Sequence, residues 1–267
     1  MNIDELYEEL SAQGSSTSGE SVIIRSGIFT DNDLINVFSG GSELYFRIDK
    51  EGLFEILNNI LSKISELPPK DDYNHMIDIF NILNNEISNY FGSSNQEQRN
   101  WFYMNNGERT DDEYVRICSM SQIKGMGIAQ CAEKASLANN ILLLLNKMDL
   151  FDYKINYMNA ITSLDNRPPE GHAILEFDRI NSRGEVIHII YDVTNPEVFM
   201  INGEECYYPA LYALSNEEYE SFLNGERFDN SKFIMSEYYQ TIDTRYYCGF
   251  SKSLDDNDLE ESNEKKL

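Results

Sequence analysis

The segment from Gly125 to Lys147, GMGIAQCAEKASLANNILLLLNK, constrains the fold of this chain more than any other. Glycines at positions 125 and 127 precede a run of alanine, leucine and isoleucine, which predicts a loop that leads into a long apolar helix. Cys131 stands at the start of this helix. Unpaired backbone N–H groups and the helix macrodipole favour a thiolate at such a position. The segment indicates a reactive thiol, but a cysteine beside alanines and leucines is equally compatible with a buried packing residue.

A histidine and an aspartate downstream fit a thiol mechanism. A Gly-His pair opens a predicted strand at His172, and a second predicted strand ends at Asp192. The two segments, HAILEFDRI and VIHIIYDVT, flank a short polar loop at 181–185, which is the pattern of a β-hairpin. If the loop is centred on Ser182, His172 and Asp192 lie directly opposite each other on one face of the sheet. The order cysteine, histidine, aspartate then predicts a nucleophile, its base and the residue that orients the base.

The other histidines are weaker candidates. His188 shares the predicted face of Asp192 but precedes it by four residues on the same strand. At about 3.3 Å per residue the two are roughly 13 Å apart, so we interpret His188 as structural. His75 lies off the apolar face of a predicted helix and carries no functional prediction.

The remaining cysteines lack any comparable context and are assigned to packing: Cys118, Cys206 and Cys248. No CxxC spacing is present, so the sequence predicts neither a zinc site, nor a dithiol redox centre, nor another cofactor. Scattered cysteines in a chain of this length indicate reduced thiols.

Composition limits the classes of partner. The chain has 267 residues, of which 41% are hydrophobic, and a formal net charge of −25. This charge opposes binding to nucleic acid and to anionic membranes; it favours a basic protein or peptide, although a solvated acidic surface explains it as well. No apolar run reaches the roughly 18 to 20 residues that span a bilayer, and the beginning of the chain lacks the pattern of a signal peptide. We expect a soluble, cytoplasmic protein, and the oligomeric state stays open.

Apolar periodicity predicts three helices besides the one that carries the cysteine. Leucine and isoleucine recur at spacings of three and four from Leu53 to Leu67. A second amphipathic helix is predicted from Asp72 to Phe91, and a short one after the capping box that begins at Ser215. Residues 92–112 are polar and contain Asn105-Asn106-Gly107, which predicts a loop with a turn.

The chain divides on this pattern into four parts. Residues 1–20 combine a weak helical pattern with a Ser/Gly/Thr run and predict a flexible arm. For residues 21–70 we predict strands and a helix that pack on the core. The main domain is predicted at residues 71–250, and a strand-like segment at 238–250 ends it. Residues 251–267 are acidic and predict a disordered tail.

The segments around the three candidate residues resemble the transglutaminase-like superfamily. GIAQCAEKASLANNILLLL is similar to the helix that carries the cysteine in that family. GHAILEFDRINSRGEVIHIIYDVTNP is similar to its second segment, in which His-Ala opens a strand and a hairpin leads to Asp-x-Thr and Asn-Pro. The resemblance covers roughly residues 72–210. It implies a papain-like α+β fold, in which the cysteine helix packs on an antiparallel sheet, and a triad of Cys131, His172 and Asp192.

The resemblance also implies a reaction, namely thiol-dependent acyl transfer or hydrolysis at an amide bond of a protein or peptide through a thioester. The backbone N–H of Cys131 is a candidate oxyanion donor, and Gln122 and Gln130 are weaker candidates for a second. The chain departs from the family at two positions where aromatic residues are common: Ala132 follows the cysteine, and Ala173 follows the histidine. The resemblance therefore does not predict the lining of the substrate cleft. The alternative is a catalytically inactive binding module on the same fold. The two ends of the chain also resemble the export signals of some bacterial effectors, but such segments are equally typical of ordinary disordered ends, and we favour this second interpretation.

Overall fold

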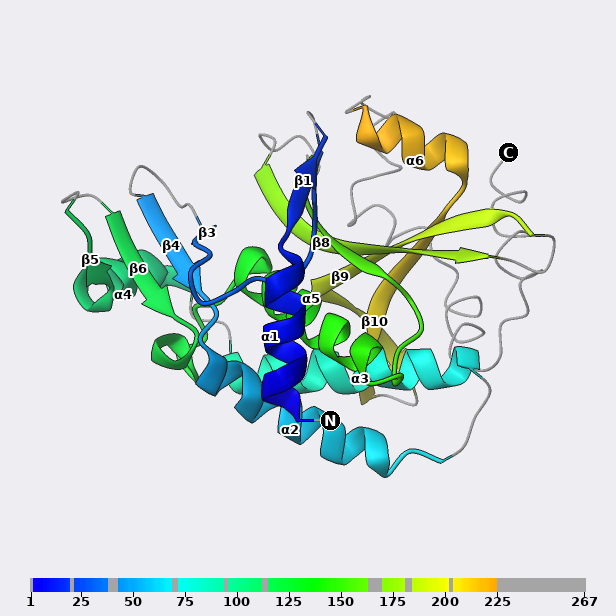
Figure 1. Ribbon diagram of the computed structural model, residues 1–267, viewed down its shortest axis with the longest axis horizontal. Helices are drawn as coiled ribbons and strands as arrows, with labels where there is room; N and C mark the ends of the chain where they lie inside the picture. The colour runs from blue at the N-terminus through cyan, green and yellow to red at the C-terminus, as the bar shows by residue number, and fades with distance from the viewer. Residues whose placement is uncertain are drawn as a thin grey trace. The chain divides into compact units, whose positions relative to one another are not determined.

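The computed structural model of the chain is a mixed α and β structure with two sheets, which confirms the predicted α+β class (Figure 1). The strand predicted at 238–250, the tail predicted at 251–267 and Cys248 lie outside the described residues. The structure describes residues 2–19, 22–37, 43–68, 72–93, 96–111, 115–162, 170–180, 184–201 and 204–224.

Backbone contacts divide the chain into two compact units whose segments alternate along the sequence. The first unit comprises Met1–Ser16, Ser26–Glu66 and Ile82–Asp152, and the second comprises Thr17–Arg25, Leu67–Asn81 and Tyr153–Leu267. The boundaries predicted after residues 20 and 70 do not coincide with these units, because each unit is assembled from segments that are distant in sequence. Cys131 belongs to the first unit, and His172 and Asp192 belong to the second.

A four-stranded sheet forms part of the first unit, in the order β3-β4-β6-β5. Its central pair, β4 and β6, is parallel, and both outer pairs are antiparallel. The strands are β3 (Ile35–Asn36), β4 (Glu43–Arg47), β5 (Glu108–Arg109) and β6 (Val115–Ser119). The helical elements of this unit are α1 (Ile3–Gln13), α2 (Lys50–Ser65), the second half of α3 (Asp72–Phe91), η1 (Gln96–Gln98), α4 (Arg99–Asn106), η2 (Ser121–Ile123) and α5 (Cys131–Lys147).

Helix α1 occupies most of the segment that was predicted as a flexible arm. Its apolar side chains Leu6, Tyr7 and Leu10 are buried. Burial of three large side chains stabilises a helix that its own propensity would leave marginal at this length. The prediction of an arm over residues 1–20 is therefore wrong for Ile3–Gln13.

Helix α5 begins at Cys131 and ends at Lys147, as predicted. All its residues from Ala135 to Leu142 are buried, which is the usual place of a helix that is apolar on most sides. The buried amide of Asn140 satisfies two backbone groups, because its Oδ1 accepts from the N–H of Phe29 at 2.8 Å and its Nδ2 donates to the Phe29 carbonyl at 2.7 Å.

The glycine loop ahead of α5 is anchored to the end of α3. The N–H of Gly125 donates to the carbonyl of Tyr90 at 2.8 Å, and that of Gly127 donates to the carbonyl of Phe91 at 2.6 Å. Both glycines have positive φ, 71° and 68°, which other residues rarely adopt. The glycines therefore permit the sharp path that delivers the chain to Cys131.

A six-stranded sheet dominates the second unit, in the order β1-β2-β7-β8-β9-β10. Every pair from β2 to β10 is antiparallel. The elements are β1 (Ser16–Ser18), β2 (Ile23–Ser26), β7 (Ile155–Thr162), β8 (Glu170–Ile180), β9 (Val186–Ile201), β10 (Glu204–Leu214) and helix α6 (Asn216–Leu223), which Ser215 caps.

The two faces of this sheet are covered by different helices. Phe177 and Tyr191 pack against Phe80 of α3, with ring centroids 5.6 and 4.5 Å apart. On the opposite face Ile174 and Ile190 belong to a buried cluster that includes the two aromatic side chains of α6, Tyr219 and Phe222. Figure 1 shows α6 above the strands.

The register of β8 and β9 differs by two residues from the predicted one. Leu175 lies opposite Tyr191, and if the register continues, Asp192 lies across from Ile174 rather than from His172. The prediction that His172 and Asp192 are directly opposed is therefore wrong. Because side chains alternate with a period of two, a shift of two residues leaves both on the same face.

Candidate active site

His172 and Asp192 form a hydrogen-bonded pair on neighbouring strands. The Nε2 of His172 lies 3.0 Å from Oδ2 of Asp192, and the two side chains are 15% and 0% exposed. The pair is diagonal across the β8–β9 ladder, a distance that long side chains span. The predicted pairing of His172 with Asp192 is therefore observed, although the predicted register was shifted by two residues.

The carboxylate of Asp192 is held by three further hydrogen bonds from its own strand. Its Oδ1 accepts from the N–H groups of Thr194 at 2.9 Å and Asn195 at 3.3 Å, and its Oδ2 accepts from Nδ2 of Asn195 at 2.8 Å. These bonds form a local turn of the Asx type. They give the sequence DVTN within β9 a physical role, because the backbone after the aspartate fixes the carboxylate that accepts from the imidazole.

An irregularity in the sheet makes this turn possible. Asp192 lies opposite Ala210 of β10, whereas Glu197 lies opposite Tyr208. The residues between on β9 (193–196) therefore face a single residue on β10, Pro209, which cannot donate to the ladder. Released from regular pairing, the backbone N–H groups after Asp192 turn toward its carboxylate.

The pair assigns roles to the two ring nitrogens. A carboxylate only accepts hydrogen bonds, so Nε2 of His172 carries a proton and donates a hydrogen bond to Asp192. The nitrogen that would exchange a proton with a reacting group is then Nδ1. A buried carboxylate on the other side of the ring stabilises the imidazolium that forms after proton uptake. The pair has the chemistry of a base with its orienting acid.

Cys131 is the first residue of α5 and is partly exposed. Cys118, by contrast, is fully buried in β6. Burial, and after it the nearby Glu133 carboxylate, raise the pKa of the Cys118 thiol to about 12. Cys118 is therefore protonated and enclosed at neutral pH, in agreement with its assignment to packing. Cys206 lies in β10.

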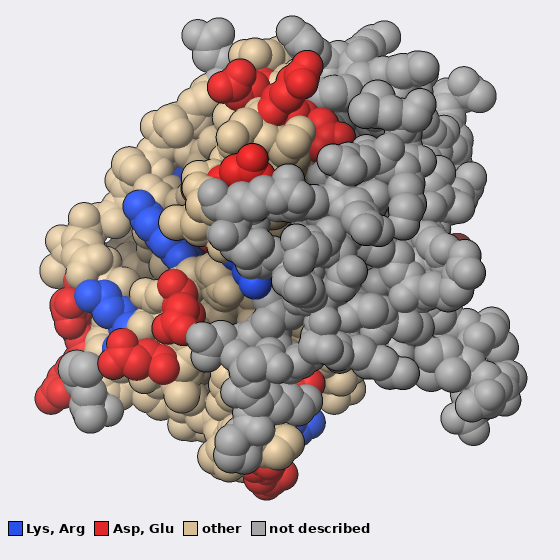
Figure 2. Space-filling view, turned by 90° about the vertical axis from the view of Figure 1, so that its right-hand side faces the viewer, with Lys and Arg blue, Asp and Glu red and all other residues tan. Residues whose placement is uncertain are grey.

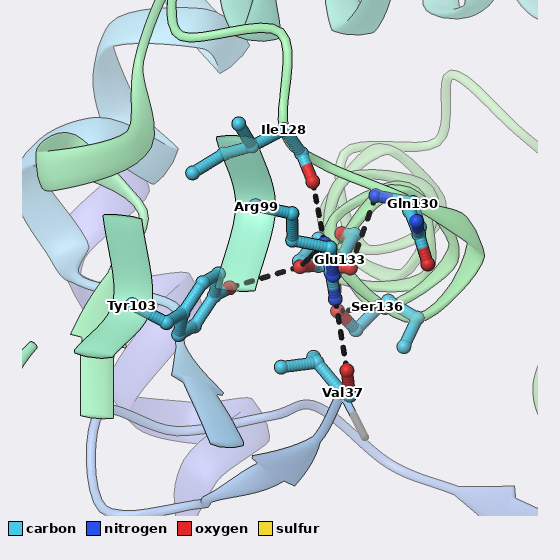
Figure 3. A network of polar contacts seen from close by, with 8 residues as sticks. Val37, Arg99, Tyr103, Ile128, Gln130, Glu133 and Ser136 are labelled. Atoms are coloured by element: carbon cyan, nitrogen blue, oxygen red, sulfur yellow. Dashed lines mark hydrogen bonds and ion pairs between the residues drawn. The ribbon is translucent and has the colours of Figure 1, made fainter. Parts of the chain in front are cut away.

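A buried ion pair beside Cys131 was missed by the sequence analysis. Arg99 of α4 and Glu133 of α5 are 2% and 0% exposed, and Nη1 lies 2.5 Å from Oε1. Figure 3 shows the guanidinium group beside the Glu133 carboxylate, with hydrogen bonds to the carbonyl oxygens of Ile128 and Val37. The segment that holds Arg99 was predicted as a loop, but residues 99–106 form helix α4.

The Glu133 carboxylate joins two more groups near the thiol. Its Oε1 accepts from the hydroxyl of Tyr103 at 2.9 Å, and its Oε2 accepts from the backbone N–H of Gln130 at 3.1 Å. Burial, and then the Glu133 charge, raise the pKa of Tyr103 well above its ordinary value, so its hydroxyl remains a donor. One signal for this network was available in the sequence, namely a glutamate in the first turn of a helix that is mostly apolar.

His188 lies in a different setting, consistent with its predicted structural role. Its Nδ1 lies 2.7 Å from Oδ1 of Asp178 and its Nε2 lies 2.9 Å from Oδ1 of Asn216. The ring also stacks on Tyr219 of α6, with centroids 3.8 Å apart. One ring nitrogen therefore contacts the neighbouring strand β8, and the other nitrogen and one ring face join the sheet to α6. His75 is partly buried near the start of α3.

The described residues contain one group with metal-ligand chemistry, formed by Glu176, Asp178 and His188, whose ligand atoms lie within 4.8 Å of one another. Glu176 already accepts from Tyr219 at 2.5 Å and from Asn156 at 2.9 Å. A cation at this place would displace hydrogen bonds that join α6 to the sheet.

Two of the predicted surface properties can be compared with the described residues. Figure 2 shows acidic side chains in several separate groups on one face, with lysine and arginine among them, rather than in a single acidic patch. Among the described helices, none combines the length and the apolar character that a membrane span requires.

Comparison of the chain with protein-family models, with curated proteins and with solved structures finds no match in any of the three. The functional argument therefore rests on the geometry of the site.

Proposed function

We propose that the protein is a thiol enzyme of the transglutaminase-like class, built on a papain-like core. It acts on an amide bond of a protein or peptide substrate through a thioester on Cys131. One observation carries the proposal: His172 donates through Nε2 to a fully buried carboxylate, Asp192, that three other hydrogen bonds hold in place. A buried acid that orients one imidazole nitrogen prepares the other as a base.

The reaction follows from these roles. The Cys131 thiolate attacks the carbonyl carbon, and the carbonyl π electrons move to oxygen. The resulting oxyanion collapses, the carbon–nitrogen bond breaks, and the leaving amine takes the proton from the imidazolium of His172. Water or a second amine then attacks the thioester, gives a proton to His172, and releases the thiolate with a new acid or amide. Peptidase, deamidase and cross-linking reactions share these steps and differ in the amide attacked and in the acceptor.

The first experiment measures whether Cys131 and His172 act together. A 1,3-dihaloacetone alkylates a thiolate and then a neighbouring imidazole, so we expect it to join the peptides of Cys131 and His172 in the intact protein. The matched control is His188→Ala, which should leave the cross-link unchanged, whereas His172→Ala should abolish it. Peptide mapping by mass spectrometry reads the result. A cross-link to His188 or to neither histidine would refute the proposed triad.

The second experiment measures turnover. The purified protein is incubated with a cell lysate and a labelled primary amine, and incorporated label, newly formed glutamates and new peptide termini are scored together. Activity should disappear in Cys131→Ala and persist in Cys118→Ala. The absence of all three products in the wild-type protein would favour a binding module over an enzyme.

A further inference from the structure

The chain around Cys131 is held from both sides by one buried charge. The guanidinium of Arg99 donates to the carbonyl of Ile128, three residues before the cysteine, at 2.5 Å. It also pairs with Glu133, two residues after the cysteine, whose carboxylate accepts from the N–H of Gln130. The same guanidinium donates to the carbonyl of Val37 at 3.0 Å, in a segment that lies far away in the sequence.

The charges in this network act on a thiolate with opposite signs. Glu133 places a negative charge in the first turn of α5, where it opposes a second negative charge on Cys131. Arg99 places a positive charge beside it. Burial lowers the pKa of Arg99, but the Glu133 carboxylate and, less strongly, Tyr103 and Cys131 outweigh burial, so the pKa of Arg99 is above its ordinary value.

We propose that Arg99 is a positioning residue for the Cys131 thiol, since its guanidinium fixes the backbone on both sides of the cysteine and offsets the charge of Glu133. The proposal rests on the proposed thiol chemistry but concerns the reactivity of Cys131, which is measurable without a substrate. Among the described residues of the first unit, Arg99 and Tyr103 of α4 and Cys118 of β6 face this turn, in addition to Glu133 of α5 itself. The proposed triad adds the imidazole of His172.

A pair of single variants and their combination separates this role from simple packing. Glu133→Gln keeps the shape and leaves the Arg99 charge without its counter-charge, so the pH midpoint of Cys131 alkylation should move down. Arg99→Met leaves the Glu133 charge unopposed, so the midpoint should move up. A shift on the order of one pH unit corresponds to about a tenfold change in rate below the midpoint. The double variant should return toward the wild-type midpoint.

The measurement is the rate of iodoacetamide alkylation at Cys131 between pH 5 and 9, followed by peptide mapping, with thermal unfolding recorded for every variant. Shifts of opposite sign support the proposal. Shifts of the same sign, or none, overturn it, because a network that only packs the helix would alter both variants in the same way.

Two variants keep the proposal testable if Arg99→Met fails to fold. Arg99→Lys retains the charge but loses the planar fork that binds several groups at once, so its midpoint should rise by much less than about one pH unit. Glu133→Gln alone must still move the midpoint down, and an unchanged or raised midpoint would overturn the proposal. This test can fail independently of the proposed function. If the dihaloacetone cross-link between Cys131 and His172 did not form, the proposed triad would be refuted, but the predicted effects of Arg99 on Cys131 alkylation would be unchanged.

Discussion

Two histidine–carboxylate pairs lie on the same two strands of one sheet, and only one has the form of a catalytic pair. His172 and Asp192 are 3.0 Å apart, and His188 and Asp178 are 2.7 Å apart. The Asp192 side chain is fully buried, whereas that of Asp178 is 62% exposed. The shorter pair is thus the more exposed one.

The pairs also differ in the elements that they join. His188 contacts Asp178 of the neighbouring strand β8 through one ring nitrogen, and it contacts Asn216 and Tyr219 of α6 through the other nitrogen and one ring face. In the other pair, Asp192 engages Nε2 of His172, and hydrogen bonds from its own backbone orient the carboxylate. The contrast teaches that burial and orientation of the acid, rather than the mere presence of a close histidine and aspartate, separate the proposed base from a histidine that joins two elements.

The largest expected difference between the pairs is in the reactivity of Cys131. His172→Ala removes the proposed base and should lower turnover by about 10² to 10⁴-fold. It should also slow alkylation of Cys131 at pH 6 by about tenfold or more, because the imidazolium no longer stabilises the thiolate. His188→Ala is the matched control and should change both rates by about twofold at most. Equal losses of turnover and of alkylation rate in the two variants would show that the two histidines do not differ in function.

The second largest effect is expected on the stability of the fold when Asp192, the buried acid, is replaced. Asp192→Asn leaves donors facing an amide in a fully buried site, and we expect a loss of about 3 kcal/mol in the free energy of unfolding. Turnover should fall as well, because the amide that replaces the carboxylate no longer fixes the protonated state of His172. Denaturant unfolding and the alkylation rate at Cys131 measure the two effects. A stability within about 0.5 kcal/mol of wild type would show that the hydrogen bonds to this carboxylate contribute little.

Local patterns in the sequence predicted several features of both units. The 3.6-residue periodicity gave α3 its observed bounds, and the glycines before the apolar run placed Cys131 at the start of α5. Alternating residues placed His172 and Asp192 on one face even though the register was shifted by two. Each of these inferences depends only on neighbours in sequence and on a fixed period.

The missed features depend on contacts between distant segments. Helix α4 has a polar sequence, and its formation is explained by burial of Arg99 and Tyr103, whose partner Glu133 is 30 residues beyond Tyr103. The helical pattern over α1 was recognised, but the segment was interpreted as part of a flexible arm, because three apolar side chains in a polar segment do not reveal the surface that covers them. The turn that fixes Asp192 requires the break in pairing between β9 and β10, for which Pro209 was the available signal.

A smaller effect is expected where α6 meets the second pair. Tyr219→Phe removes the hydroxyl that donates to the buried carboxylate of Glu176 at 2.5 Å, and should cost about 1 to 2 kcal/mol. Burial, and then the hydrogen bond to Glu176, raise the pKa of Tyr219 above its ordinary value. Above about pH 10 the unfolded chain releases this proton while the folded protein retains it, so stability falls as the pH rises. Thermal unfolding at pH 8 and 11 should show a smaller decline in the variant than in the wild type.

The smallest effect is expected from Asp178, and it completes the contrast with Asp192. Asp178→Asn preserves an oxygen that can accept from Nδ1 of His188, and the side chain is mostly exposed, so water solvates whatever the amide leaves unpaired. The free energy of unfolding should fall by about 0.5 kcal/mol or less, and the rate of Cys131 alkylation should not change. Denaturant unfolding of Asp178→Asn beside Asp192→Asn measures the difference directly. A loss at Asp178 that matched the loss at Asp192 would mean that exposure does not separate the two acids, and the structural assignment of His188 would then have to be abandoned.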